Sequence, residues 1–97
     1  MTFQVNLTPS AEEDLRHFRV HEQRIIIDAI LSHLGVDAST ASRRRRKLRP
    51  NPLAPWELRV GIYRAFYEIE GESIVKVVAI GWKEHNSLFV RGRIVEL

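Results

Sequence analysis

The chain of 97 residues contains no cysteine and no long hydrophobic run. Without cysteine it can form no disulfide, no thiolate nucleophile and no zinc site built on thiolates. The longest apolar stretch, residues 77–80, is far shorter than the roughly 20 residues that cross a membrane as a helix. The first twenty residues include three consecutive acids and no apolar run. We therefore expect no secretory signal peptide, no membrane partner and a soluble, cytoplasmic protein.

The length also limits what kind of site the protein can hold. A chain of 97 residues with 44% apolar content predicts one compact domain over residues 1–97. A domain of this size buries about 60–65% of the surface of its unfolded chain, which leaves room for one core and a shallow site. A deep cleft for a cofactor is not expected, and we predict that the protein works without one.

Positive charge is concentrated in one stretch of the chain. Between Ser42 and Arg64 there are eight arginines and lysines against one acid, Glu57. The net charge of this stretch is +7 whereas that of the whole chain is +3, so the remaining residues have a net charge of −4. Such a separation predicts a basic surface that attracts polyanions, because each phosphate contact releases condensed counterions. The four consecutive arginines at 43–46 are equally consistent with a solvated loop.

The N-terminal third predicts one strand and two helices. Apolar residues at 3, 5 and 7 alternate with polar ones, which is typical of a half-buried strand. Thr8 followed by Pro9 predicts a helix start with Thr8 as N-cap, although Ser10 and Glu13 offer a competing capping box. A second helix is expected over residues 20–34, with Gly35 as its C-cap. Because so few residues separate them, the two helices should form an antiparallel hairpin.

The rest of the chain predicts a long loop followed by strands. Residues 36–55 contain three prolines and are expected to be a loop, and loops of that length are often functional. Strand-forming patterns cover residues 56–60, 63–69 and 74–82, of which the last is nearly apolar and should be the central strand. Residues from 87 onward suggest a short terminal hairpin, with a final helix as the alternative.

This order of elements predicts an α+β fold. An N-terminal strand and an antiparallel two-helix hairpin would pack on one face of a small, mostly antiparallel sheet. Arg59 and Arg64 lie on neighbouring strands joined by a tight turn, so their guanidinium groups can converge on the opposite face. The alternative is that they are ordinary strand residues paired with Glu57 and Glu68.

Four segments of the chain match one family pattern. They are residues 7–15, 47–49, 56–69 and 80–86, and they include a Tyr-Arg pair at 63–64 preceded by a basic residue and leucine at 47–48. On these segments the sequence resembles the RelE/ParE family of toxins from type II toxin–antitoxin systems. The resemblance implies the fold described above and a cognate antitoxin that covers the toxin. It also implies one of two activities, since RelE-like members cut messenger RNA on the ribosome and ParE-like members inhibit DNA gyrase without cutting RNA.

The leading hypothesis from the sequence is a ribosome-dependent mRNA endoribonuclease that works by metal-independent acid–base cleavage. Such cleavage needs a base for the 2′-OH, an acid for the leaving oxygen and cations for the charged phosphorane. The resemblance implies catalytic roles for Arg59, Arg64 and His85, because an imidazole can serve as acid or base near neutral pH. No metal site is expected. His17 and His21 have the spacing of a metal pair but no obvious third ligand.

The predicted RNA-binding residues and the alternatives complete this interpretation. Lys47, Arg49 and Lys83 are candidates for holding phosphates, and Phe89 is a candidate for stacking on a base. Two departures from the nuclease pattern favour a gyrase inhibitor instead. Phe89 stands near where some nuclease members carry a tyrosine, and Glu57 stands where RelE itself has a lysine. A third hypothesis is a non-catalytic nucleic-acid-binding module that uses arginines 43–46. In the toxin interpretations we expect the antitoxin segment to be acidic, because it must compete for the basic surface.

Overall fold

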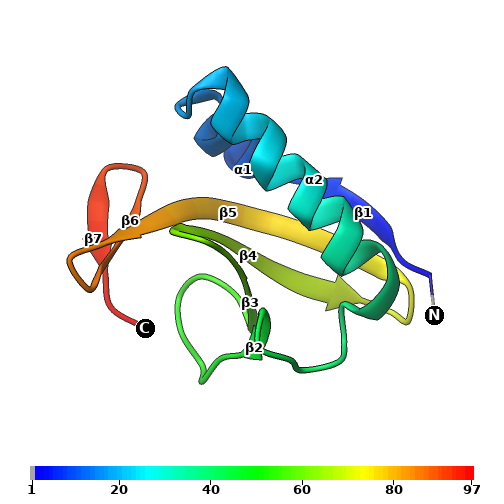
Figure 1. Cartoon of the computed structure of the whole chain (residues 1–97). Coiled ribbons are helices and arrows are strands. Elements are labelled where there is room, and N and C mark those ends of the chain that lie inside the picture. The colour runs from blue at the N-terminus through cyan, green and yellow to red at the C-terminus, as the bar shows by residue number, and fades with distance from the viewer. Residues whose placement is uncertain (1) are drawn as a thin grey trace.

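The computed structural model describes residues 2–97 of the chain. In chain order the elements are β1 (Gln4–Leu7), α1 (Pro9–Arg16), α2 (Val20–Asp37), β2 (Arg45–Lys47), β3 (Trp56–Val60), β4 (Tyr63–Glu70), β5 (Ile74–Glu84), β6 (Ser87–Val90) and β7 (Arg93–Val95). The predicted fold class is confirmed, because a strand and two helices precede a mostly antiparallel sheet (Figure 1). Within residues 2–97, neither helix is long and apolar enough to cross a membrane.

The sheet is built around β5, its longest strand. The order β2-β3-β4-β5-β6-β7 is antiparallel throughout. β1 lies parallel to the first half of the other edge of β5, and β6 pairs with the second half of that edge. Figure 1 shows β1 near one end of β5 and the β6–β7 hairpin at the other. β5 is therefore the interior strand that its nearly apolar sequence predicts.

Both helices cover one face of this sheet (Figure 1). α2 buries Ile26, Ile30 and Leu34, whose spacing of four residues places them on one stripe of the helix. They pack with sheet residues that include Leu58 and Val77. This layer holds most of the core, and the opposite face of the sheet carries a smaller buried cluster of Ala54, Phe66, Ala79, Leu88 and Val90.

α1 begins where the sequence predicts and α2 ends later than predicted. The Thr8 hydroxyl accepts a hydrogen bond from the Ala11 N–H at 3.1 Å, which confirms Thr8 as N-cap. Gly35 is helical and not a C-cap, because α2 continues to Asp37. The buried stripe extends to Ala38, and the Gly35 carbonyl accepts a hydrogen bond from the Phe3 N–H at 2.8 Å. These contacts outweigh the roughly 1 kcal/mol by which glycine disfavours a helix.

The loop expected over residues 36–55 contains a strand, β2, that pairs with β3. The Arg45 side chain holds β2 in place. Its guanidinium donates hydrogen bonds to the Thr40 carbonyl at 2.8 Å and to the His33 carbonyl at 3.3 Å, so it anchors β2 to the end of α2. Four successive arginines show no strand pattern of their own, and the strand forms because β3 supplies a partner.

The C-terminal residues form the expected hairpin rather than a helix. Arg91 and Gly92 connect β6 to β7, and both have positive φ angles of 54° and 74°. Positive φ at both central residues is the requirement of the two-residue turn that suits twisted antiparallel strands. The hairpin turns the end of the chain back toward the face of the sheet away from the helices (Figure 1).

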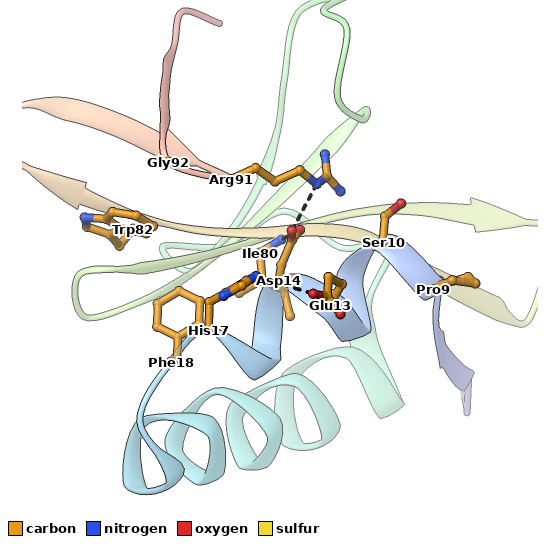
Figure 2. Close-up of a pocket in the computed structure, with 10 residues that line it drawn as sticks. All are labelled: Pro9, Ser10, Glu13, Asp14, His17, Phe18, Ile80, Trp82, Arg91 and Gly92. Carbon is orange, nitrogen blue, oxygen red and sulfur yellow. Dashed lines mark hydrogen bonds and ion pairs between the residues drawn. The ribbon is translucent and has the colours of Figure 1, made fainter.

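One stretch of β5 has no strand partner on its outer edge. Residues 78–80 lie between the end of β1 and the start of β6. There the Asp14 carboxylate accepts a hydrogen bond from the Ile80 N–H at 3.0 Å, and Arg91 donates one to the Val78 carbonyl at 3.2 Å. Asp14 and Arg91 also form an ion pair at 2.9 Å (Figure 2). Because buried backbone groups need partners, this pair of side chains completes the sheet edge.

Two glycines should respond in opposite ways to alanine. A Cβ at Gly81 would collide with the Phe89 carbonyl where β5 meets β6, whereas a Cβ at Gly35 would meet nothing within 4 Å. We expect Gly81→Ala to lower the free energy of unfolding by about 2–3 kcal/mol and Gly35→Ala to raise it by up to about 1 kcal/mol. Urea denaturation measures both changes. A Gly81→Ala variant as stable as the wild type would contradict the pairing of β5 with β6.

Asp14→Ala should destabilise the protein by about 2 kcal/mol, because the Ile80 N–H and Arg91 both lose their partner. Glu13→Ala is the matched control. Glu13 is exposed and its contacts with Arg16 and His17 lie at the surface, so its loss should change stability by no more than about 0.5 kcal/mol. Equal effects of the two substitutions in chemical denaturation would show that the Asp14 carboxylate does not support the sheet edge.

The cost of Asp14→Ala should also depend on pH. Burial raises the pKa of the Asp14 carboxyl above its ordinary 3.8, although the Ile80 N–H and Arg91 oppose this shift. An acid with a raised folded pKa contributes most to stability when protonated, and this contribution is lost as pH rises through that pKa. The stability gap between wild type and Asp14→Ala should therefore widen as pH falls from about 7 toward about 4. A gap that narrows over this range would contradict the assigned burial.

Candidate functional site

Arg59 and Arg64 lie directly opposite each other on β3 and β4. The turn that joins the two strands contains Gly61 at φ 59°, a conformation that glycine adopts without steric cost. Both arginines alternate with residues that pack under the helices, such as Leu58 and Ala65. They therefore occupy the opposite face of the sheet, as the strand pattern predicts.

A buried carboxylate, that of Glu57, lies between the two arginines. Glu57 is only 5% exposed, and its Oε1 accepts a hydrogen bond from Arg59 Nε at 3.2 Å. Its Oε2 lies 3.9 Å from Arg64 Nε. One carboxylate thus compensates two guanidinium groups. Of the two partners in the alternative from the sequence, only Glu57 contacts the arginines, because Glu68 pairs with Lys76 at 3.8 Å.

Arg64 is held further by backbone groups. Its Nη1 donates hydrogen bonds to the Gly61 carbonyl at 2.7 Å and to the Tyr63 carbonyl at 2.9 Å. Only 11% of its side chain is exposed, against 38% for Arg59. Burial lowers the pKa of Arg64, and Arg59 acts in the same direction while Glu57 opposes it. Arg64 is therefore a fixed internal cation, and Arg59 is the more accessible of the two.

A groove of about 710 Å³ lies on this face, between the loop after β2 and the C-terminal hairpin. Its cations are Arg46, Lys47, Arg49, Arg59 and Lys83. Its apolar residues are Leu48, Leu88, Ile94, Val95 and Leu97. Of the predicted phosphate-binding residues, Lys47, Arg49 and Lys83 line this groove together with Arg59. The Lys47 ammonium lies over the Trp56 ring, 5.5 Å from its centroid, so part of its charge is already engaged.

His85 does not line the groove, although its neighbours Lys83 and Asn86 do. It lies exposed in the turn between β5 and β6 with a φ of 50°. Within residues 2–97, no hydrogen bond or ion pair holds its imidazole. The structure therefore leaves His85 without a group that orients it toward Arg59 or Arg64.

Phe89 lies on the other face of the sheet, contrary to the expected grouping with the cations. It pairs with Trp82 across β5 and β6, and the two rings stack at 5.3 Å. Trp82 in turn contacts Phe18, at the end of α1, edge to face at 5.9 Å. Phe89 thus lies on the helix side of the sheet. The register of β6 pairs Phe89 with Trp82, whose neighbour Lys83 points to the opposite face.

A second pocket, of about 720 Å³, opens on the helix side between α1, β5 and the β6–β7 turn. Figure 2 shows the Asp14–Arg91 pair in this pocket, with Phe18 and Trp82 to one side. The sequence analysis missed this pair. The available signal was the place of Asp14 in α1, where helical spacing puts it on the same stripe as the buried Ala11. No group of three or more potential metal ligands occurs within residues 2–97.

The chain was compared with known families and structures. Residues 5–86 match the family described as the ParE toxin of the type II toxin–antitoxin system parDE. Among solved structures, it is similar to a chain of the toxin–antitoxin complex RelBE2 from Mycobacterium tuberculosis. The TM-score is 0.73 at 20% sequence identity, with 86% of this chain and 100% of that chain covered. At this identity the likeness shows the fold. No curated protein matches.

The family match covers most of the chain, including both helices, β1 and the strands that carry Glu57, Arg59 and Arg64. It agrees with the resemblance that the sequence segments indicate and with the observed fold. The chain belongs to the ParE toxin family of type II toxin–antitoxin systems.

Proposed function

We propose that this chain is a toxin that arrests growth by binding DNA gyrase, without cleaving RNA. The observation that carries the proposal is the buried carboxylate of Glu57 between Arg59 and Arg64. Phosphorane stabilisation requires cations aimed at the place where negative charge develops. Here the two arginines are compensated by Glu57, and its carboxylate repels an incoming phosphate.

The acid–base chemistry also lacks the expected support. A general acid or base must be held within hydrogen-bond reach of the proton that it moves. His85 is exposed in a turn and is not among the groove residues, and Arg64 is anchored to two backbone carbonyls. Of the three groups expected to perform cleavage, His85 thus lies apart from the groove, whereas Arg59 and Arg64 already contact Glu57.

The composition of the groove favours a protein ligand. Exposed apolar side chains, those of Ile94 and Leu97, lie in the same groove as cations such as Lys83. Protein interfaces combine an apolar centre with a polar rim in this way. Gyrase is the target that the ParE-like members of the family imply.

The second candidate is the ribosome-dependent endoribonuclease that led the hypotheses from the sequence. One observation favours it, namely that Lys47, Arg49, Arg59 and Lys83 line the same groove. With Arg46 the groove has five cations, and such a group suits a polyanion. We favour gyrase binding over this candidate because Glu57 compensates Arg59 and Arg64.

The two candidates make different predictions for His85→Asn. Asparagine tolerates the positive φ of this turn but cannot act as an acid or base near neutral pH. If the toxin works by binding alone, His85→Asn should arrest growth as strongly as the wild type after induction. If His85 is the acid or base of a nuclease, activity should fall by about 10²-fold or more. Colony counts after induction measure the effect.

His21→Asn is the matched control, because His21 is an exposed histidine on α2, away from the groove. Mapping RNA 5′ ends in the same induced cells separates the mechanisms. Uncut transcripts with double-strand DNA breaks support gyrase inhibition. Codon-registered cuts that vanish with His85→Asn, but not with His21→Asn, would overturn the proposal in favour of the nuclease.

We further propose that a cognate antitoxin binds the same groove with an acidic segment. Among the described residues, Arg46, Arg49 and Lys83 form no ion pair, and these groove cations would attract such a segment. The exposed apolar side chains of the groove, Ile94 and Leu97, would supply the buried contact. An antitoxin bound there would block access to the toxin's own ligand site.

Removing two groove cations, in Arg49→Gln/Lys83→Gln, should weaken antitoxin binding at least about tenfold. The matched control is Arg19→Gln/Arg24→Gln, which removes two exposed charges from the helix layer. Isothermal titration with the antitoxin measures both. Equal affinities for the two double variants would show that the antitoxin does not use the groove cations.

A further inference from the structure

The chain carries a second cationic surface, beyond the groove, at the start of β2. Residues 38–56 contain six arginines and lysines and no acid. The residues of this stretch that precede β2, are exposed and lie outside the groove are Ser39, Thr40, Ala41, Ser42, Arg43 and Arg44. We call these six residues the basic edge, because they lead into the outermost strand of the sheet.

The arginines of the basic edge have no internal role in the structure. Within residues 2–97, no carboxylate lies within 4.0 Å of the guanidinium of Arg43 or Arg44, and neither side chain donates a hydrogen bond. Arg45 differs, because its side chain is committed to the carbonyls of His33 and Thr40. The packing of the fold thus explains Arg45 and leaves Arg43 and Arg44 unexplained.

The basic edge lacks what a protein ligand needs. None of its six residues has a large apolar side chain, so the edge itself supplies no apolar centre for a protein interface. Addition of a strand is also obstructed. The Ser42 N–H donates to the Arg45 carbonyl at 2.8 Å, and the Ser42 hydroxyl accepts from the Arg45 N–H at 3.1 Å. These two bonds occupy backbone groups that an added strand requires.

The surface also lacks what a single-stranded nucleic acid needs. Proteins that bind single strands stack the bases on aromatic side chains. Residues 37–55 contain no aromatic side chain, and the adjacent Trp56 is 7% exposed and lies under the Lys47 ammonium. A duplex presents its phosphates and not its base faces, and arginine, serine and threonine are the side chains that contact phosphates.

We propose that the basic edge binds the phosphate backbone of duplex DNA, without sequence preference. Arg43 and Arg44 supply the cations, and the hydroxyl side chains of Ser39 and Thr40 lie beside them on the same exposed segment. The site is separate from the groove, since none of these residues lines it. The proposal stands whether the groove binds gyrase or RNA.

The test measures the affinity of the toxin for a fluorescein-labelled DNA duplex of about 20 base pairs. Fluorescence anisotropy gives this affinity at salt concentrations between about 50 and 200 mM. Each phosphate contact contributes about −0.9 to the slope of log K against log salt concentration. Arg43→Gln/Arg44→Gln should therefore make the slope shallower by about 1.8 and weaken binding to unrelated sequences equally. Arg19→Gln/Arg24→Gln removes the same charge from the helix layer and should leave the slope unchanged.

Three results would overturn the proposal. One is no duplex binding at the lowest salt concentration. Another is an equal change of slope in the two double variants, which would mean that only net charge matters. The third is binding to single-stranded RNA that is tighter than binding to the duplex and that is lost in Arg43→Gln/Arg44→Gln but kept in Arg49→Gln/Lys83→Gln, which would assign the basic edge to RNA. Arg49→Gln/Lys83→Gln, which alters only the groove, should bind the duplex with a slope closer to wild type than Arg43→Gln/Arg44→Gln.

Discussion

The pairing of β3 with β4 places two arginines opposite each other, and Glu57 makes this arrangement tolerable. Like charges that face each other across a strand pair are destabilising, more so where burial removes water. Glu57 contacts both Arg59 and Arg64 from its buried position on β3. The same contact that allows the register also sets the chemistry of this face, because it compensates cations that a nuclease would aim at its substrate.

The remaining cations divide between two surfaces, the groove and the basic edge. Cations around the groove lie beside apolar side chains, which suits a protein segment. Arg43 and Arg44 lie beyond the groove among small polar residues, which suits a phosphate backbone. We therefore propose two ligand surfaces of different chemistry on a protein of 97 residues. The helix layer takes no part in either surface, since it seals the core on the opposite face of the sheet.

Local patterns in the sequence predicted those parts of the fold that depend on local causes. The N-cap at Thr8, the turn at Gly61 and the apolar strand β5 each follow from residues close together in the chain. Features that depend on distant partners were missed. β2 exists because β3 pairs with it, and Gly35 stays helical because Phe3 bonds to its carbonyl.

The candidate site shows the same division between local and distant causes. Alternation along two strands was enough to place Arg59 and Arg64 on one face. The face on which Phe89 lies depends on the register between β5 and β6, which no local pattern reveals. The ion pair of Asp14 with Arg91 joins residues from opposite ends of the chain. The pair forms where residues 78–80 of β5 have no strand partner between β1 and β6, and that gap follows from the sheet topology.

Because Glu57 compensates Arg59 and Arg64, we expect the toxin to bind its target without cutting RNA. Two reconstituted reactions run side by side with purified toxin test it most directly. One is DNA supercoiling by gyrase, and the other is translation of a defined messenger RNA by ribosomes, with the RNA 5′ ends mapped. We expect the toxin to stop supercoiling by gyrase and to leave the messenger RNA intact. Cuts in the messenger RNA together with undiminished supercoiling would contradict it.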